Sequence, residues 1–227
     1  MLGSLLQAVR QTHPLIHCIT NYVTINDCAN ILLAAGASPI MADAPEEAAA
    51  VTARSQGLTL NLGTLHAERI PAMLASGRQA NASGIPAVLD PVGAGVSAFR
   101  AGAARQLLEA VQFAVIRGNL SEIRALADAG SHACGVDAGD SLTPQTLDAC
   151  LELAGQLARR TGAVVAVTGE TDLVTDGETA YCIHNGHPMM RSVTGTGCQL
   201  SCLTAAFVAA SPGQPLQAAA AAVCAMG

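Results

Sequence analysis

The chain of 227 residues contains no lysine and no tryptophan, and only 2% of its residues are aromatic. The absence of lysine excludes a phosphate-binding loop of the Walker A type and an enzyme that attaches its substrate to a lysine as a Schiff base. All 11 basic residues are arginines, and 17 acidic residues give a net charge of −6. Because the sequence also has no basic run, we expect no binding to nucleic acid.

Long hydrophobic runs are also missing, although the mean hydropathy of +0.39 is high. The longest apolar stretch, residues 31–42, is interrupted by Gly36, Ser38 and Pro39 and is too short to cross a bilayer. Residues 1–14 lack the order of charge, apolar core and cleavage site that defines a signal peptide. We therefore expect no membrane insertion and a cytoplasmic location.

The 8 cysteines are scattered, without a Cys-x-x-Cys pair or zinc-ligand spacing. We expect most of them to be reduced thiols that pack as small hydrophobic residues. Cys198 and Cys202 are four residues apart and share one face of a predicted helix. The spacing of the 6 histidines singles out none of them for a role.

Short apolar runs alternate with helical segments along the chain. Strands are expected at residues 15–19, 39–41, 58–61, 87–90, 114–117, 164–168, 173–175 and 180–183. Helices are expected at residues 26–35, 45–56, 67–83, 100–111, 121–129 and 144–161, and as an alanine-rich pair from Cys198 onwards. The alternation predicts one α/β domain over residues 1–227, with a mostly parallel sheet covered on both faces. The sequence Asp176-Gly177 between two β-like runs predicts a hairpin and an antiparallel edge.

Polar residues follow four of these strands directly, each within a glycine or proline turn. The turns are NLGT at 61–64, DPVGAG at 90–95, RGN at 117–119 and TGE at 168–170. Ligands of open α/β sheets bind beyond the carboxyl ends of the strands, so we expect the site at this edge.

Residues 195–198, GTGC, precede a helix and form the fifth turn of interest. The backbone N–H groups of Gly195, Thr196 and Gly197 and the helix dipole would converge on an anion such as a phosphate in transfer. Cys198 would lie beside that anion, with its pKa lowered by the same helix end. The alternative is that the two glycines only permit a tight turn and that Cys198 fills space.

Seven segments in this order resemble the hydroxyethylthiazole kinase family of the ribokinase-like superfamily, nearly from end to end. They are HCITN at 17–21, GASPIMA at 36–42, LNLGTL at 60–65, LDPVGAG at 89–95, IRGNLSEI at 116–123, VAVTGE at 165–170 and VTGTGC at 193–198. GTGC is the most specific mark, because most ribokinase-like enzymes carry an aspartate in place of Cys198. The resemblance implies a three-layer ribokinase-like sandwich and ATP-dependent phosphorylation of 4-methyl-5-(2-hydroxyethyl)thiazole, a step of thiamine biosynthesis and salvage.

The resemblance also implies roles for individual residues. Arg117 and Thr168 would contact ATP, and Asp90 and Glu122, the latter in an N-x-x-E motif at 119–122, would orient a hydrated Mg²⁺ through water. On the substrate side, Cys198 would face the reacting hydroxyl, while Met41, Gly195 and Asn21 would contact the thiazole.

The family further implies a homotrimer whose active sites lie between subunits. Family members continue for a few tens of residues beyond the position of Gly227; if Gly227 is the natural end, the nucleotide pocket is expected to be open on one side, and the sequence leaves open whether the chain was trimmed.

Several of these residues also have a purely structural explanation. Met41 would be core, Asn21 a helix cap or turn residue, Asp90 an ordinary turn opener, and Arg117 and Glu122 a surface ion pair.

Three other functions stay open from the residues alone. A sibling kinase for a pyrimidine or pyridoxal alcohol would carry aspartate at position 198, and a cysteine-nucleophile acyl enzyme would need a histidine base near Cys198. An inactive nucleotide sensor would keep GTG without needing the thiol.

Overall fold

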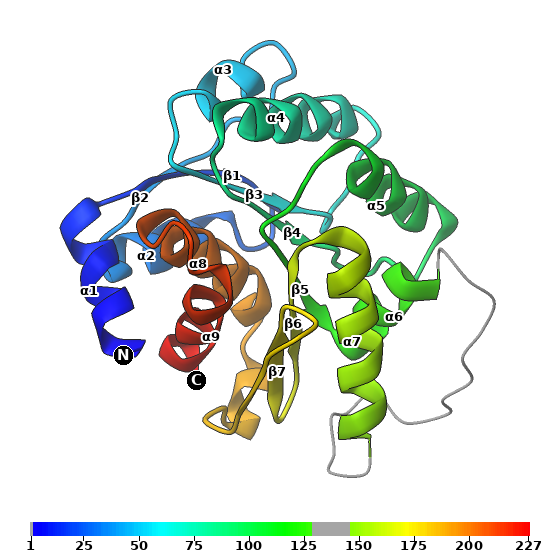
Figure 1. The fold of residues 1–227 in the computed structure, drawn as a ribbon. Coiled ribbons are helices and arrows are strands. Elements are labelled where there is room, and N and C mark those ends of the chain that lie inside the picture. Colours follow the sequence, from blue (N-terminus) through cyan, green and yellow to red (C-terminus); the bar gives the residue numbers. More distant parts are fainter. Residues whose placement is uncertain (1, 129–145) are drawn as a thin grey trace.

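The computed structural model describes residues 2–128 and 146–227, which form one α/β sandwich around an 8-stranded sheet (Figure 1). The strands are β1 (Leu15–Ile19), β2 (Ser38–Ile40), β3 (Gly57–Asn61), β4 (Ala87–Asp90), β5 (Val115–Asn119), β6 (Val164–Thr168), β7 (Asp172–Thr175) and β8 (Ala180–Ile183). Their order is β2-β1-β3-β4-β5-β6-β7-β8. Strands β1 to β6 are parallel, and β7 and β8 add the expected antiparallel hairpin at one edge.

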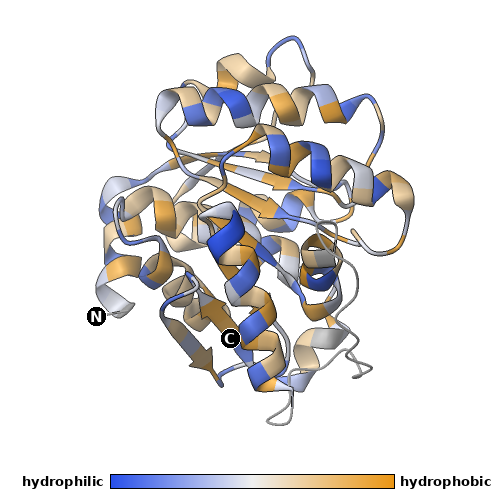
Figure 2. Cartoon of the chain, turned by 45° about the vertical axis from the view of Figure 1, so that its right-hand side comes forward, coloured by the Kyte–Doolittle hydropathy of each residue, from blue (hydrophilic) through white to orange (hydrophobic). Residues whose placement is uncertain are grey.

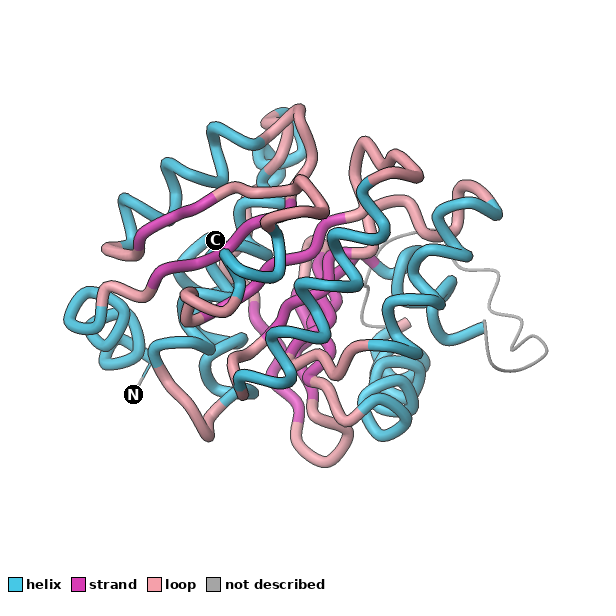
Figure 3. Tube along the Cα trace, turned by 90° about the horizontal axis from the view of Figure 1, so that it is seen from above, coloured by secondary structure: helices cyan, strands magenta, loops and turns pink. Residues whose placement is uncertain are grey.

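Helices cover both faces of the sheet, as Figures 1 and 3 show. One layer consists of α1 (Leu2–Thr12), α2 (Ile25–Ala35), α8 (Thr196–Ala210) and α9 (Pro215–Met226). The other consists of α3 (Ala48–Thr52), α4 (Arg69–Ser83), α5 (Ala98–Ala110), α6 (Leu120–Asp128) and α7 (Leu147–Thr161). A 3₁₀ helix, η1 (Pro188–Ser192), leads towards α8. None of the described helices is long and apolar enough to cross a membrane.

Two hydrophobic clusters, one on each side of the sheet, form the core. Hydrophobic residues dominate the central strands, whereas hydrophilic residues recur along the outer helices (Figure 2). Helix α8 is buried along most of its length, from Leu200 to Val208. This burial fixes the amino end of α8 firmly against the carboxyl edge of the sheet.

Most predicted elements are confirmed, and four strands have the predicted bounds: β1, β4, β6 and β8. Strand β5 continues to Asn119 instead of ending at Arg117, because Gly118 and Asn119 still pair with β6. Helix α8 begins at Thr196, two residues before the predicted start. The ends of two predicted helices, residue 129 and residues 144–145, lie outside the described residues.

The helix predicted at 45–56 is wrong in length, since only Ala48–Thr52 is helical. The N–H groups of Arg54 and Ser55 bond three residues back, to Val51 and Thr52, which tightens the last turn. The Gln56 N–H then bonds to the Leu15 carbonyl. The chain must enter β3 at Gly57, and pairing with β1 ends the helix early.

Candidate functional site

Polar side chains gather at the carboxyl edge of the sheet, from neighbouring parallel strands. They are Asn21 after β1, Asn61 in β3, Asp90 in β4, Arg117 in β5 and Thr168 in β6. The amino end of α8 lies against the same edge, because α8 packs on β1, β3, β4 and β5. The structure therefore brings most of the predicted site residues together.

Asp90 is fully buried at the centre of this group. Its Oδ2 accepts hydrogen bonds of 2.7 Å from both Asn61 Nδ2 and Ser201 Oγ, and lies 3.7 Å from Arg117 Nη1. Its Oδ1 is buried without a hydrogen-bond partner. Burial raises the pKa of Asp90 from 3.8 to about 6; the Arg117 charge acts against this rise, and the Glu122 charge adds to it.

Two asparagines connect Asp90 to the thiol of Cys198. Asn21 donates from Nδ2 to Asn61 Oδ1 at 3.2 Å and to Cys198 Sγ at 3.0 Å. Asn21 Oδ1 also closes a turn by accepting from the N–H groups of Val23 and Thr24, each at 3.1 Å. The structural role expected for Asn21 is therefore present together with its contact to the predicted catalytic thiol.

The expectation that the pKa of Cys198 is lowered is wrong. Burial raises the pKa of the Cys198 thiol above 9.0, and the nearby charge of Asp90 adds to the rise. Hydrogen-bonding contacts with Asn61, Thr24 and Asn21 lower it only in part. The thiol is set back from solvent, where the cost of desolvating the thiolate exceeds what the helix end provides.

The turn before α8 depends on two glycines. Gly195 is the residue that precedes the helix and has φ of +85°, and a Cβ there would lie 2.3 Å from Thr24 Cγ2. Gly197, in the first turn, lies against the guanidinium of Arg117. The N–H groups of the first turn of a helix have no partner within it, so they face the site as anion donors.

A pocket of about 440 Å³ opens beside this turn. Arg117 and Thr168 line it together with Thr196 and Gly197, and Arg117 Nη2 donates to Thr168 Oγ1. Val223, Met226, Met190 and Pro188 supply an apolar part. A lining that combines cationic and amide donors with apolar side chains suits a nucleotide.

Glu122 lies at the start of α6 and links two loops. Its Oε1 accepts from the N–H of Gly93 at 3.0 Å, and its Oε2 accepts from the N–H of Asn119 at 2.9 Å. Asn119 Oδ1 in turn accepts from the N–H of Glu122, which completes a reciprocal cap of the helix. The described structure contains no Arg117–Glu122 ion pair, since Arg117 pairs with Asp90 instead.

Met41 follows β2 at the same edge and is partly buried against the core cluster that also contacts Cys198. His17, which had no role predicted from the sequence, holds Ala42, the residue after Met41. The Nε2 of His17 bonds to the Ala42 carbonyl at 2.8 Å, and its Nδ1 lies 2.8 Å from Thr52 Oγ1. Burial lowers the pKa of His17. His17 therefore holds the Met41 segment as a neutral side chain.

Arg69, at the start of α4, joins the loops that carry Asn21 and Met41. Its Nη2 donates to the Thr20 carbonyl at 2.6 Å, and its Nε lies 3.1 Å from Asp43 Oδ2. Its guanidinium stacks 4.7 Å from the centre of the Tyr22 ring, and the Tyr22 hydroxyl donates to Asp43 Oδ2. Arg69 thereby connects the β1–α2 loop with the β2–α3 loop.

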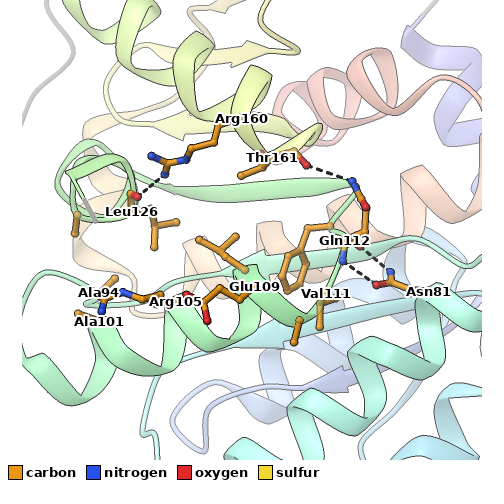
Figure 4. A pocket seen from close by; sticks show the side chains of 14 residues that line it. Asn81, Ala94, Ala101, Arg105, Glu109, Val111, Gln112, Leu126, Arg160 and Thr161 are labelled. Atoms are coloured by element: carbon orange, nitrogen blue, oxygen red, sulfur yellow. Dashed lines mark hydrogen bonds between the residues drawn. The ribbon is translucent and has the colours of Figure 1, made fainter. Parts of the chain in front are cut away.

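A second pocket, of about 470 Å³, lies between α5, α6 and α7 (Figure 4). Arg160 donates there to the carbonyls of Leu126 and Ala127, and Gln112 pairs with Asn81 and the Thr161 carbonyl. These polar groups tie helices together, and none of the predicted site residues lines the pocket.

The turn that begins at Asn61 lies at the site, as expected from the sequence, but Asn61 had no individual role there, and Ser201 was missed as a member of the site. Asn61 carried a usable signal, because it ends a predicted strand just before a glycine turn. Ser201 is a polar residue four positions after Gly197 within an apolar helix, and that signal is weak, since its hydroxyl also lies near the Gly197 carbonyl.

Comparison with known proteins identifies the family. Residues 6–227 match the model of the hydroxyethylthiazole kinase family. A hydroxyethylthiazole kinase of Clostridium acetobutylicum is 50% identical over 100% of this chain and 84% of its own length. One of Methanoculleus marisnigri is 50% identical over 96% of this chain and 77% of its own length.

Solved structures agree with this assignment. A hydroxyethylthiazole kinase protein from Pyrococcus horikoshii OT3 superposes with a TM-score of 0.87 at 37% identity, covering 98% of this chain and 81% of that one. A pyridoxal kinase of Bacillus subtilis, at 17% identity and a TM-score of 0.62 over 93% of this chain and 88% of that one, shares the fold. The chain belongs to the hydroxyethylthiazole kinase family.

Proposed function

We propose that this chain transfers the γ-phosphoryl group of ATP to the primary alcohol of 4-methyl-5-(2-hydroxyethyl)thiazole, within thiamine biosynthesis and salvage. One observation carries the proposal beyond family membership: the first turn of α8 presents Cys198 towards Asn21 and presents Thr196 and Gly197 to the pocket of Arg117 and Thr168. A phosphate on that turn would lie between a nucleotide and an alcohol.

In this proposal, the protein contributes mainly position and charge neutralisation, as is usual in phosphoryl transfer. The N–H groups of residues 195–198 bind the group in transfer, and the fixed guanidinium of Arg117 binds phosphate oxygens. Thr168 holds that guanidinium by accepting from it. The alcohol oxygen bonds to the γ-phosphorus as the bond to the bridging β–γ oxygen breaks, and ADP leaves.

Cys198 is the proposed group that faces the alcohol. Its Sγ accepts a hydrogen bond from Asn21, so a sulfur lone pair is already directed into a polar contact. In its thiolate form, the sulfur can receive the hydroxyl proton as the new oxygen–phosphorus bond forms, which gives the neutral thiol. Among the described residues, Asn21 donates the hydrogen bond to Cys198 and no histidine bonds to it, which disfavours a cysteine-nucleophile acyl enzyme.

Asp90 and Glu122 are the proposed carboxylates for magnesium. The residues fit such an ion, because Asp90 Oδ1 is buried without a partner and the two carboxylates are close enough for the Glu122 charge to raise the pKa of Asp90. A bound Mg²⁺ would neutralise phosphate charge and keep several waters, which these carboxylates would orient. Asn61 and Ser201 hold Asp90 in place for this role.

Met41, Gly195 and Asn21 are the proposed thiazole contacts. Asn21 and Gly195 both lie against Thr24, and Met41 follows the adjacent strand at the same sheet edge. The ties made by His17 and Arg69 hold the two loops that carry Asn21 and Met41, which supports a preformed substrate site.

A homotrimer with active sites between subunits is part of the proposal. Four large hydrophobic side chains next to Asn21 and on α2 are exposed, which supports an interface there: Tyr22, Val23, Ile25 and Leu33. We also propose a cytoplasmic location, which the free thiols of the seven described cysteines support. Light scattering after size exclusion measures the assembly, and a monomeric mass at working concentration would contradict the trimer.

The function is tested with a panel of primary alcohols, ATP and Mg²⁺, by following ADP release. The panel contains the thiazole alcohol, a hydroxymethylpyrimidine and pyridoxal. Thiazole-dependent ADP release with phosphorylated thiazole as the product is expected. No thiazole-dependent release would overturn the proposal, and release with pyridoxal or the pyrimidine alone would favour a sibling kinase.

A further inference from the structure

We propose that Asn61 is a positioning residue that acts through Asn21 to hold Cys198 Sγ as a hydrogen-bond acceptor beside the substrate alcohol. The inference deepens the proposed function and rests on it for the identity of the alcohol. It concerns a residue to which the sequence assigned no individual role, and it is carried by the direction of six hydrogen bonds.

The direction of the Asn21 amide is fixed by the backbone. The N–H groups of Val23 and Thr24 lie 3.1 Å from Oδ1 of Asn21, and a backbone N–H only donates. Oδ1 is therefore the carbonyl oxygen, and the NH₂ group must point the other way. That side of Asn21 faces Cys198 and Asn61.

The direction of the Asn61 amide is fixed in the same way. The N–H of Gly63 donates to Asn61 Oδ1 at 2.8 Å, so this atom must be the carbonyl oxygen. The NH₂ group of Asn61 then donates to Asp90 Oδ2, and its oxygen accepts from Asn21. A Cβ on Gly63 would lie 2.8 Å from Asn21 Cβ and 2.9 Å from Asn61 Oδ1, so the close approach requires glycine.

These two amide directions determine which hydrogen bond Cys198 receives. One N–H of Asn21 is directed to Asn61 Oδ1 and the other to Cys198 Sγ, so neither is free to rotate away. The reversed amide would present a carbonyl oxygen to Cys198 and hold its S–H as a donor. The observed direction instead stabilises the thiolate, which accepts hydrogen bonds and is the form that can receive the alcohol proton.

The first test is a double-mutant cycle between Asn61→Ala and Cys198→Ala. Asn61→Ala is expected to lower kcat at least about fivefold more in the parent than in the Cys198→Ala background, because contacting residues that act as a unit are not additive, whereas the loss that acts through Asp90 is common to both backgrounds. The KM for ATP is expected to stay unchanged. Equal losses of kcat in the two backgrounds would overturn the proposal, since a general structural defect does not depend on the thiol.

The matched control is Asn81→Ala. Asn81 also bonds on both sides of its amide, to the N–H and the carbonyl of Gln112 at 2.7 and 2.8 Å, but lies away from the site. Asn81→Ala is expected to change the free energy of unfolding in urea without changing kcat. A loss of kcat in Asn81→Ala equal to that in Asn61→Ala would assign the effect to stability and overturn the proposal.

The second test needs no substrate. The rate at which iodoacetamide alkylates Cys198, located by peptide mass spectrometry, is expected to fall several-fold in Asn61→Ala, because a thiolate that accepts fewer hydrogen bonds is less stable. An unchanged rate would overturn the inference even if the parent showed no thiazole kinase activity, whereas that lack of activity alone would overturn only the proposed function. If Asn61→Ala does not fold, Asn21→Asp keeps the acceptor for Val23 and Thr24 but lacks the donor to Cys198, and the same slowing decides the question.

Discussion

The guanidinium of Arg117 occupies the space in which a side chain on Gly197 would begin. A Cβ built on Gly197 would lie 2.5 Å from Arg117 Nη1 and 2.8 Å from Nη2. The guanidinium is also tied to Thr168 and faces Asp90, so it has a defined place at the amino end of α8. A glycine at 197 is therefore what allows a cation and helix amides to meet in one pocket.

Gly197→Val is expected to abolish ATP turnover while leaving the protein folded and soluble. The new side chain would displace the flexible end of Arg117 and block the approach of a phosphate to the helix amides, for a rate loss of at least about 100-fold. Turnover is measured by ADP release and the fold by circular dichroism. Gly102→Val is the control, because a Cβ on Gly102 meets nothing within 4 Å. Unchanged turnover in Gly197→Val would exclude this turn as the phosphate site.

Glu122→Gln is expected to weaken the response to Mg²⁺ more than thiazole binding. The amide keeps the shape but loses the charge and one of two bonds to the N–H groups of Gly93 and Asn119, so stability should also fall by about 1 kcal/mol. The Mg²⁺ concentration for half-maximal rate and the KM for thiazole are measured together. Glu109→Gln, in the second pocket, is the control. A raised thiazole KM with an unmoved Mg²⁺ optimum would contradict the assignment.

Asp90 predicts a specific pH dependence of stability. Its folded pKa of about 6 lies above its usual 3.8, so the folded state binds the proton more tightly than the unfolded state. The contribution of Asp90 to the free energy of unfolding is therefore largest below about pH 4, falls as the pH rises to about 6, and is constant above that.

Urea unfolding of the parent and of Asp90→Asn across this range checks the prediction. The difference between the two should change with pH between about 4 and about 6 and level off above, because only the parent titrates at this position. Turnover should also rise over the same range as the carboxylate forms. Parallel stability curves for the two proteins would contradict the raised pKa.

Arg69→Met is expected to lower the free energy of unfolding by about 1–3 kcal/mol and to raise the KM for thiazole. The substitution keeps the apolar stem but removes the hydrogen bond to the Thr20 carbonyl and the ion pair with Asp43, so the loops of Asn21 and Met41 lose their connection. Arg69→Lys should restore only part of the affinity, since an ammonium cannot form the same fork. Tyr22→Phe loses one solvent-exposed hydrogen bond, from the Tyr22 hydroxyl to Asp43, and should have only a small effect on stability and on the KM for thiazole. An unchanged KM in Arg69→Met would show that the loops hold without it.

The parallel sheet was predictable because its strands are short apolar runs, four of which end directly in a glycine or proline turn. The errors have local causes. Strand β5 runs through Gly118 and Asn119, since pairing with β6 outweighs the turn signal of these residues. The first turn of α8 includes Thr196 and Gly197 because Gly195 supplies the positive φ that starts the helix.

The site was only partly predictable, because its hydrogen bonds join residues far apart in the chain. Asn21 and Cys198 are separated by 177 positions, and Ser201 and Asp90 by 111. Sequence spacing carries no sign of such contacts. Burial was the other unknown: it decides the direction in which the pKa of Cys198 moves, and it depends on how α8 packs rather than on the GTGC turn itself.

Cys198→Ala is expected to slow turnover without abolishing it, near the low end of the about 10²–10⁴-fold range typical of a general base, because the alcohol needs little activation in loose phosphoryl transfer. Cys198→Asp is expected to be at least as active as the parent. A carboxylate only accepts hydrogen bonds and is ionised at neutral pH, so it suits the donor that Asn21 provides.

The pH dependence separates a base from a packing residue at position 198. Since the pKa of the Cys198 thiol is raised above 9.0, the parent rate should still be rising between about pH 6 and about pH 9, whereas the aspartate and alanine variants should be nearly flat there. Cys202→Ala, one turn along α8 and fully buried, is the control and should keep the parent profile. Turnover is compared at saturating thiazole and ATP. An inactive aspartate variant beside a fully active alanine variant would remove the base role and leave Cys198 as packing.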